Sequence, residues 1–291
     1  MTPSPILLGK LSRAKLLTRW QAASVGHGER RSRSKGAGME FADHRDYQIG
    51  DDLRHIDPHL YARFDRNYIR QYDVYRQLPI TIFIDSSRSM NCGTPNKFTY
   101  ACDLAATIGF VGLAGGDQVQ LAFGAGETVR WSPRFQGVLR AQRMFDWIGE
   151  QAPMPTGTFA PALKVVLRNL SDRGLLIVMS DWWAEDLESD LRVATAAGQE
   201  LWGLHVAAPD ELDPTLLGNG EVRLVDVETG HEVELALDRT MRERYLRSFE
   251  VWREQLQALI TRAKGRYLLT PSNQPTDRLM LQEWRRIGII G

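Results

Sequence analysis

Three short, strongly apolar runs constrain the fold of this chain more than any other feature of its sequence. They cover residues 79–84, 174–179 and 201–206. Strands of this composition are covered on both faces, as in parallel sheets. Segments with helical patterning separate or follow them, at about 98–114, 136–149, 160–170 and 186–197. The alternation predicts an α/β fold with a doubly wound, mostly parallel sheet.

Further elements extend this pattern toward the C-terminus. Strands are predicted at 118–123, 127–131 and 266–269, a hairpin at 221–237 and a final helix after the last strand. The clearest helix spans 239–263, because its large apolar residues recur every three or four positions. Asp238 is its expected N-cap. The α/β domain is therefore predicted to run from residue 79 to 291.

Residues 1–78 are predicted to form an N-terminal extension. Residues 1–20 have helical spacing of their apolar side chains, and residues 67–76 have strand character that would add an edge strand to the sheet. Between them, residues 24–38 are rich in Gly, Ser and Arg, which is typical of a loop. Its basic cluster at 30–35 is either a solvated surface or a site that grips phosphate or an acidic partner.

Composition excludes several classes of function. The chain has 36 basic and 36 acidic side chains, so no charge excess attracts nucleic acid or an anionic membrane. Its apolar runs are far shorter than the roughly 20 residues of a membrane helix. Cys92 and Cys102 are too few for a disulfide framework or a cysteine-based zinc site. We expect a cytoplasmic protein with no nucleic-acid partner and no membrane span.

The candidate chemistry lies where the predicted strands end, since ligands of doubly wound sheets bind beyond the carboxyl ends of their strands. Asp85, Ser87 and Ser89 follow the first apolar run, and Asp181 follows the second. Thr158 lies in the loop before the helix at 160–170. Carboxylate and hydroxyl oxygens suit a hard cation such as Mg²⁺. The alternative is that these residues only cap the following helices.

These residues resemble a known motif. Residues 82–90 read Ile-Phe-Ile-Asp-Ser-Ser-Arg-Ser-Met, which is similar to the start of a von Willebrand factor A domain. The resemblance implies a metal-ion-dependent adhesion site (MIDAS) that binds Mg²⁺ or Mn²⁺ and captures a carboxylate of a partner protein, without catalysis. It implies five ligands, with Thr156 as an alternative to Thr158: Asp85, Ser87, Ser89, Thr158 and Asp181.

A second resemblance covers the preceding segment. Residues 36–41, 45–57 and 62–63 resemble the signature of domain-of-unknown-function family 58 (DUF58), although Pro58 stands where the family usually has tryptophan. Its members are bacterial and archaeal, carry a von Willebrand A-like domain, and are often encoded beside MoxR-type AAA+ ATPases. The resemblance implies an accessory of such an ATPase in protein maturation or complex assembly, acting on an unknown client protein.

Two groups of residues are candidates for partner contact. Trp182 and Trp183 follow the predicted metal aspartate, where they would either anchor a partner or pack their loop. The charged stretch containing Asp52, Arg54 and Asp57 would either form internal Arg–carboxylate pairs, the interpretation we favour, or face a partner. His205 lies within an apolar run and is expected to be a core histidine.

The leading hypothesis is therefore a non-enzymatic, metal-dependent interaction module. The alternatives are a Mg²⁺-dependent phosphohydrolase with Asp85 as nucleophile, and a scaffold that binds no metal. The phosphohydrolase is disfavoured because phosphatases of the haloacid-dehalogenase type need a second aspartate where this chain has Ser87.

Overall fold

The computed structural model describes residues 2–19, 39–48, 51, 53–74, 77–170, 173–184, 186–218, 220–227 and 230–291. The chain divides into two compact units, one comprising Met1–Gly26 and Leu78–Gly291 and the other His27–Gln77. The smaller unit ends at Gln77, next to the predicted boundary. The prediction that residues 1–78 form one extension is wrong, because the beginning of the chain packs with the larger unit.

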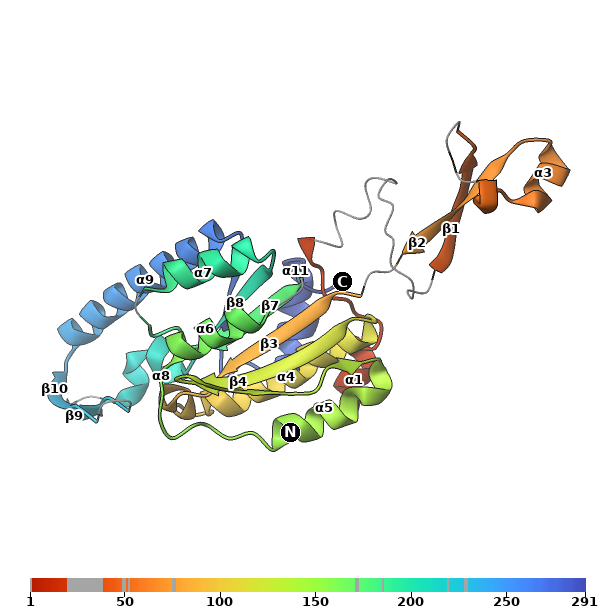
Figure 1. The fold of residues 1–291 in the computed structure, drawn as a ribbon. Helices are drawn as coiled ribbons and strands as arrows, with labels where there is room; N and C mark the ends of the chain where they lie inside the picture. The colour runs from red at the N-terminus through yellow and green to blue at the C-terminus, as the bar shows by residue number, and fades with distance from the viewer. Residues whose placement is uncertain are drawn as a thin grey trace. The chain divides into compact units, whose positions relative to one another are not determined.

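The larger unit is built on one sheet with the strand order β11-β8-β7-β3-β4-β5 (Figure 1). Its parallel strands are β3 (Pro79–Asp85), β4 (Gln118–Ala125), β7 (Leu175–Ser180), β8 (Glu200–Ala207) and β11 (Arg266–Pro271). β5 (Thr128–Trp131) and β6 (Phe135–Gln136) pair antiparallel with β4. The predicted doubly wound, mostly parallel sheet is confirmed, and the winding direction reverses between β3 and β7.

Helices cover both faces of this sheet. Because side chains alternate along a strand, Ile82 and Ile84 of β3 join the core on one face and Phe83 the core on the other. The first face carries α1 (Pro5–Leu11), α4 (Lys97–Ala114), α5 (Ala141–Gly149), α10 (Thr276–Arg278) and α11 (Trp284–Arg286). The second carries α6 (Phe159–Asn169), α7 (Leu187–Ala196) and α9 (Arg239–Arg262) (Figure 1).

The two ends of the described chain lie together. The amide of Lys15 donates to the carbonyl of Gly291 at 3.1 Å, and the amide of Gly291 donates back at 3.0 Å. Within the predicted helix over 1–20, the structure has a shorter helix, Pro5–Leu11, with Ser4 as its N-cap. Leu7 and Leu11 of this helix pack into the core beside α4.

Short elements follow the main strands. They are η2 (Arg88–Asn91), η3 (Val138–Arg140), α8 (Pro209–Leu212), η4 (Pro214–Leu217) and a π-helical turn, η5 (Leu279–Glu283). The predicted hairpin is β9 (Gly220–Val225) paired with β10 (Glu232–Leu237). The carboxylate of Asp238 accepts the amide of Met241 as the predicted N-cap of α9.

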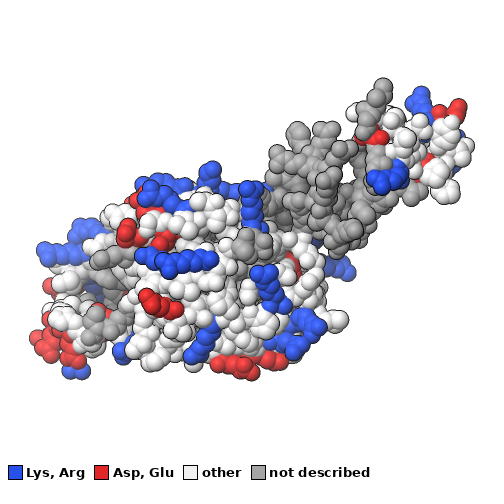
Figure 2. Space-filling view, viewed as in Figure 1, with Lys and Arg blue, Asp and Glu red and all other residues white. Residues whose placement is uncertain are grey.

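The charged side chains are segregated locally, although the net charge of the chain is zero. Acidic side chains lie over the β9–β10 hairpin and basic ones along α9 (Figure 2).

The smaller unit contains a two-stranded antiparallel sheet of β1 (Met39–Asp46) and β2 (Tyr68–Val74). Between these strands lie η1 (Leu53–His55) and α3 (Pro58–Phe64). The segment predicted as an edge strand of the main sheet is therefore paired with β1 instead, because an antiparallel partner lies within its own unit. No helix among the described residues is long and apolar enough to cross a membrane.

Candidate functional site

Asp85 is the centre of the candidate site. It ends β3 beside β7, at the point where the winding of the sheet reverses, and its side chain is fully buried. The amide of Ser87 donates to Oδ1 at 2.9 Å, and the hydroxyl of Ser180 donates to Oδ2 at 2.6 Å. Both carboxylate oxygens are therefore held in fixed positions by groups from two neighbouring strand ends.

The electrostatic surroundings of Asp85 are unusual for a carboxylate. Burial, followed by the negative charge of Asp181, raises its pKa to about 7, against the lowering effect of the hydrogen bonds from Ser180 and Ser87. The ordinary value is 3.8. The structure thus places a second carboxylate near a buried first one, an arrangement that favours a cation in the vicinity.

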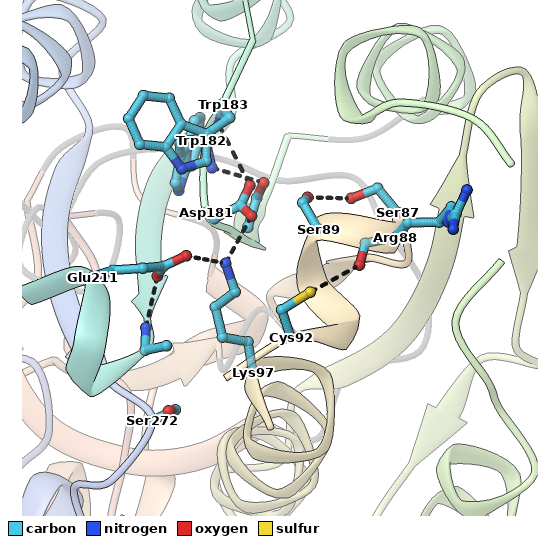
Figure 3. A network of polar contacts seen from close by, with 12 residues as sticks. Ser87, Arg88, Ser89, Cys92, Lys97, Asp181, Trp182, Trp183, Glu211 and Ser272 are labelled. Carbon is cyan, nitrogen blue, oxygen red and sulfur yellow. Dashed lines mark hydrogen bonds and ion pairs between the residues drawn. The ribbon is translucent and has the colours of Figure 1, made fainter. Parts of the chain in front are cut away.

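The turn after β3 presents two hydroxyl groups. The Oγ atoms of Ser87 and Ser89 lie 3.0 Å apart (Figure 3). Met90, fully buried in the core, anchors the 3₁₀ turn that carries Ser89. The backbone of Ser86 is held on both sides, because its amide donates to Gly124 and its carbonyl accepts the amide of Met154. The turn is therefore rigidly attached to β4 and to the loop before α6.

Asp181 follows β7 and is almost completely buried. The Lys97 ammonium donates to its Oδ2 at 3.0 Å and also to Oε1 of Glu211 at 2.6 Å (Figure 3). Burial lowers the pKa of Lys97, but the Asp181 and Glu211 carboxylates more than offset this and raise it above its ordinary value. Oε2 of Glu211 in turn accepts the amide of Ala208 at 2.7 Å.

Sequence reasoning did not identify Lys97 or Glu211. One signal was present, since Lys97 occupies the first position of α4, where the helix dipole disfavours a cation. A lysine there needs compensating anions. Nothing in the sequence identified which anions these are. Ser180, the hydrogen-bond partner of Asp85, was not identified either.

Thr158 is positioned by a tight backbone approach. Its carbonyl accepts the amide of Gly126, in the turn between β4 and β5, at 2.8 Å. Gly157 has φ +102, and a Cβ there would lie 2.5 Å from the nitrogen of Gly126, so only glycine fits. The Thr158 side chain is exposed and does not cap α6. The Asp85 carboxylate accepts hydrogen bonds from Ser87 and Ser180 and not from Thr158 or Thr156. The choice between the two threonines stays a prediction.

The donors present fit a hard divalent cation. Buried carboxylates and serine hydroxyls are oxygen ligands of the type that Mg²⁺ and Mn²⁺ bind. Within the described part of the chain, no group of three or more His, Cys, Asp or Glu side chains is placed to hold a metal ion. A cation at this site would therefore depend on hydroxyl oxygens and water as well as carboxylates.

Trp182 and Trp183 differ in exposure. Trp182 has no exposed surface, packs against Phe159 with ring centroids 5.3 Å apart, and donates its indole N–H to the carbonyl of Leu204. Of the two predicted roles, Trp182 therefore has the packing role, because a fully buried ring is inaccessible to a partner. Trp183 is 49% exposed and stacks on Trp252 at 4.2 Å.

The other predicted residues have varied outcomes. Asp57 is buried and caps α3, accepting the amide of His59 at 2.9 Å and lying 2.9 Å from Nε2 of His44, so its role here is structural. Arg54 is exposed, and Asp52 lies outside the described residues. His205 is a core histidine as predicted, with Nδ1 2.7 Å from the Tyr267 hydroxyl.

Known proteins similar to this chain were found at the levels of family, sequence and fold. Uncharacterized protein Mb1516 of Mycobacterium bovis and uncharacterized protein Rv1480 of Mycobacterium tuberculosis are each 28% identical over 254 residues, covering 84% of this chain and 78% of the relative. BatB from Bacteroides thetaiotaomicron has a TM-score of 0.45 at 15% identity, covering 72% of this chain and 98% of BatB.

The VWA domain of SpRpn10 has a TM-score of 0.42 at 10% identity, covering 70% of this chain and 94% of that domain. These solved structures are distant likenesses and carry no information on function. The family model for proteins of unknown function DUF58 matches residues 43–255, which is most of the chain. This chain therefore belongs to the DUF58 family.

Proposed function

We propose that this protein is a non-enzymatic interaction module whose strand-end cluster binds Mg²⁺ or Mn²⁺ and uses it to capture a carboxylate of a partner protein. The ligands would come from the five predicted residues: Asp85, Ser87, Ser89, Thr158 and Asp181. The single observation that carries the proposal is the fully buried Asp85 carboxylate, which has a second carboxylate nearby. Asp181 is the charged group that most strongly affects the pKa of Asp85.

The physical argument concerns uncompensated charge. A buried carboxylate is costly unless a cation or a proton neutralises it. Asp85 accepts hydrogen bonds at both oxygens, but Ser180 and the Ser87 amide are neutral donors. Lys97 is shared between Asp181 and Glu211. A divalent cation would supply the missing positive charge, and when bound it would offer a coordination position to an incoming carboxylate.

The choice of partner rests on the family. Members of DUF58 are often encoded beside MoxR-type AAA+ ATPases, so we infer that such an ATPase is the partner and that the pair acts on a client in protein maturation or complex assembly. Trp183, which is half exposed and stacked on Trp252, lies two residues after Asp181 and would contribute apolar contact to such a partner.

The experiment is a calorimetric titration of the full chain with Mg²⁺ and with Mn²⁺. Asp85→Asn and Ser89→Ala are expected to abolish binding. Asp117→Asn is the matched control. Asp117 is also a buried aspartate, but it accepts the amide of Leu78 where β3 and β4 begin, at the other end of β3 from Asp85. Equal metal affinity in Asp85→Asn and the unaltered protein would contradict the proposal.

Partner capture is tested with a MoxR-type ATPase from the same organism. Binding is expected in Mg²⁺ and not in chelator, and Asp85→Asn is expected to lose it. Full-strength capture in chelator would instead favour a scaffold that needs no metal.

The geometry disfavours the phosphohydrolase alternative. A nucleophilic carboxylate must reach its substrate, whereas Asp85 is fully buried and both its oxygens accept hydrogen bonds. Turnover of a generic phosphate ester that Asp85→Asn abolishes would restore that alternative.

A further inference from the structure

Lys97 brings an ammonium group into the interior of the molecule beside the candidate metal site. Only 1% of the residue is exposed, and its Nζ donates to Asp181 at 3.0 Å and to Glu211 at 2.6 Å. Lysine is almost never fully buried unless it is paired. Figure 3 shows the ammonium between the two carboxylates, which come from the loop after β7 and from α8, the short helix after β8.

We propose that the Lys97 ammonium is a built-in counter-cation of Asp181 that opposes the binding of a divalent ion and thereby sets how weakly the site holds it. The inference rests on the proposed function, because it concerns the affinity of the same site. It assigns Lys97 an electrostatic role that is distinct from holding the loops together.

The charges of the cluster support this role. Asp85, Asp181 and Glu211 carry three negative charges and Lys97 one positive charge, so the four groups together carry a charge of −2 when all are ionised. A divalent cation would bring the total to zero. With the ammonium removed, the same carboxylates would attract that cation more strongly, because like charges a few ångströms apart in a poorly solvated site repel strongly.

The geometry makes the competition direct. The Asp181 oxygen that receives the Lys97 hydrogen bond is Oδ2, while Oδ1 faces the amide of Trp183 at the longer distance of 3.4 Å. A metal ion bound by Asp181 would therefore share the negative charge of this carboxylate with Lys97. Glu211 favours binding of a divalent cation, because it partly neutralises the ammonium and adds a negative charge of its own.

A purely structural salt bridge predicts the opposite sign. If Lys97 only joined the loop after β7 to α8, then removing it would loosen Asp181 and weaken metal binding. If Lys97 opposes the metal, removing its charge strengthens binding. The direction of the change in affinity therefore separates the two roles.

The experiment titrates the full chain with Mg²⁺ and with Mn²⁺ at pH 8, in parallel with three variants. Lys97→Met keeps the length of the side chain without its charge and is expected to bind at least about tenfold more tightly. Lys97→Arg keeps the charge and is the matched control, with affinity close to that of the unaltered protein. Glu211→Gln keeps the ammonium but removes a carboxylate, and is expected to bind at least about threefold more weakly.

The outcomes distinguish this inference from the proposed function. Weaker or unchanged binding in folded Lys97→Met overturns the inference and leaves the metal site standing. Binding in Lys97→Met but not in the unaltered protein supports the inference and overturns metal dependence of the natural protein. If neither binds, both are overturned. Should Lys97→Met not fold, Glu211→Gln decides, since its side chain is 27% exposed and unchanged affinity there overturns the inference.

Discussion

The Ser180 hydroxyl donates a 2.6 Å hydrogen bond to Oδ2 of Asp85, linking the ends of β7 and β3. The same hydroxyl oxygen accepts the amide of Trp182 at 2.9 Å. One small side chain thus connects the candidate metal aspartate, Asp85, with the backbone turn that contains Asp181. All three groups are fully buried or nearly so.

Replacing Ser180 with alanine is expected to lower the free energy of unfolding by about 1–3 kcal/mol, because a buried carboxylate oxygen and a buried amide both lose their partner. Urea denaturation of the metal-free protein measures this change. Ser189→Ala is the control, since Ser189 is exposed on α7 and its loss is expected to have little effect. Equal stability of the two variants would show that the Ser180 bridge contributes nothing.

The two threonines before α6 are expected to behave differently. Thr158→Val is expected to weaken Mg²⁺ binding at least about tenfold, as loss of a group around a bound metal does. Thr156→Val has the same change in shape and is expected to leave affinity unchanged. Calorimetry of both variants measures the difference, and the reverse result would make Thr156 the ligand.

Adjacent tryptophans are expected to differ in their effect on stability. Trp182→Ala creates a cavity between Phe159 and β8 and is expected to cost about 3–5 kcal/mol. Trp183→Ala removes only an exposed stacking contact with Trp252, worth about 1 kcal/mol or less. Chemical denaturation of both variants tests this. A large loss of stability in Trp183→Ala would mean that its stack is part of the core.

His205 is expected to make stability depend on pH. Burial lowers its pKa to about 4 from an ordinary value of 6.5. Between these values the unfolded chain binds a proton that the folded chain does not, so the free energy of unfolding falls as the pH drops. The contribution of His205 lost between pH 7 and pH 5 is about 2 kcal/mol.

His205→Gln is expected to reduce that pH dependence by this amount in denaturation series at the two pH values. The exposed Ser189 supplies the control, because Ser189→Ala removes no titratable group and is expected to leave the dependence unchanged. An identical pH dependence in His205→Gln and the unaltered protein would refute the assignment.

Much of the fold could be predicted because its signals are local. The apolar runs of β3, β7 and β8, the helical periodicity of α9 and the Asp238 cap depend on residues within one element. The predictions were wrong where a local pattern does not identify which strand pairs with which. The residues of β2 read correctly as a strand, but pairing with β1 instead of the main sheet is a tertiary choice.

The burial of the two tryptophans shows the same limit. Trp182 and Trp183 are neighbours of the same type, yet φ of Trp182 is +63 and its ring turns into the core while the ring of Trp183 remains half exposed. The space for Trp182 exists because Gly203 on β8 has no side chain, since a Cβ there would lie 3.0 Å from the Trp182 ring. No spacing rule in the sequence connects these two positions.

By itself the sequence determined the doubly wound class and the Asp85, Ser87 and Ser89 turn, because apolar patterning and motif spacing act over a few residues. Only the tertiary structure decided that Ser180 holds Asp85 across 95 residues, and that Lys97 reaches Asp181 across 84 and Glu211 across 114. The physical reason is that strand order, not sequence distance, brings the ends of β3, β7 and β8 together, and buried charges must find partners there.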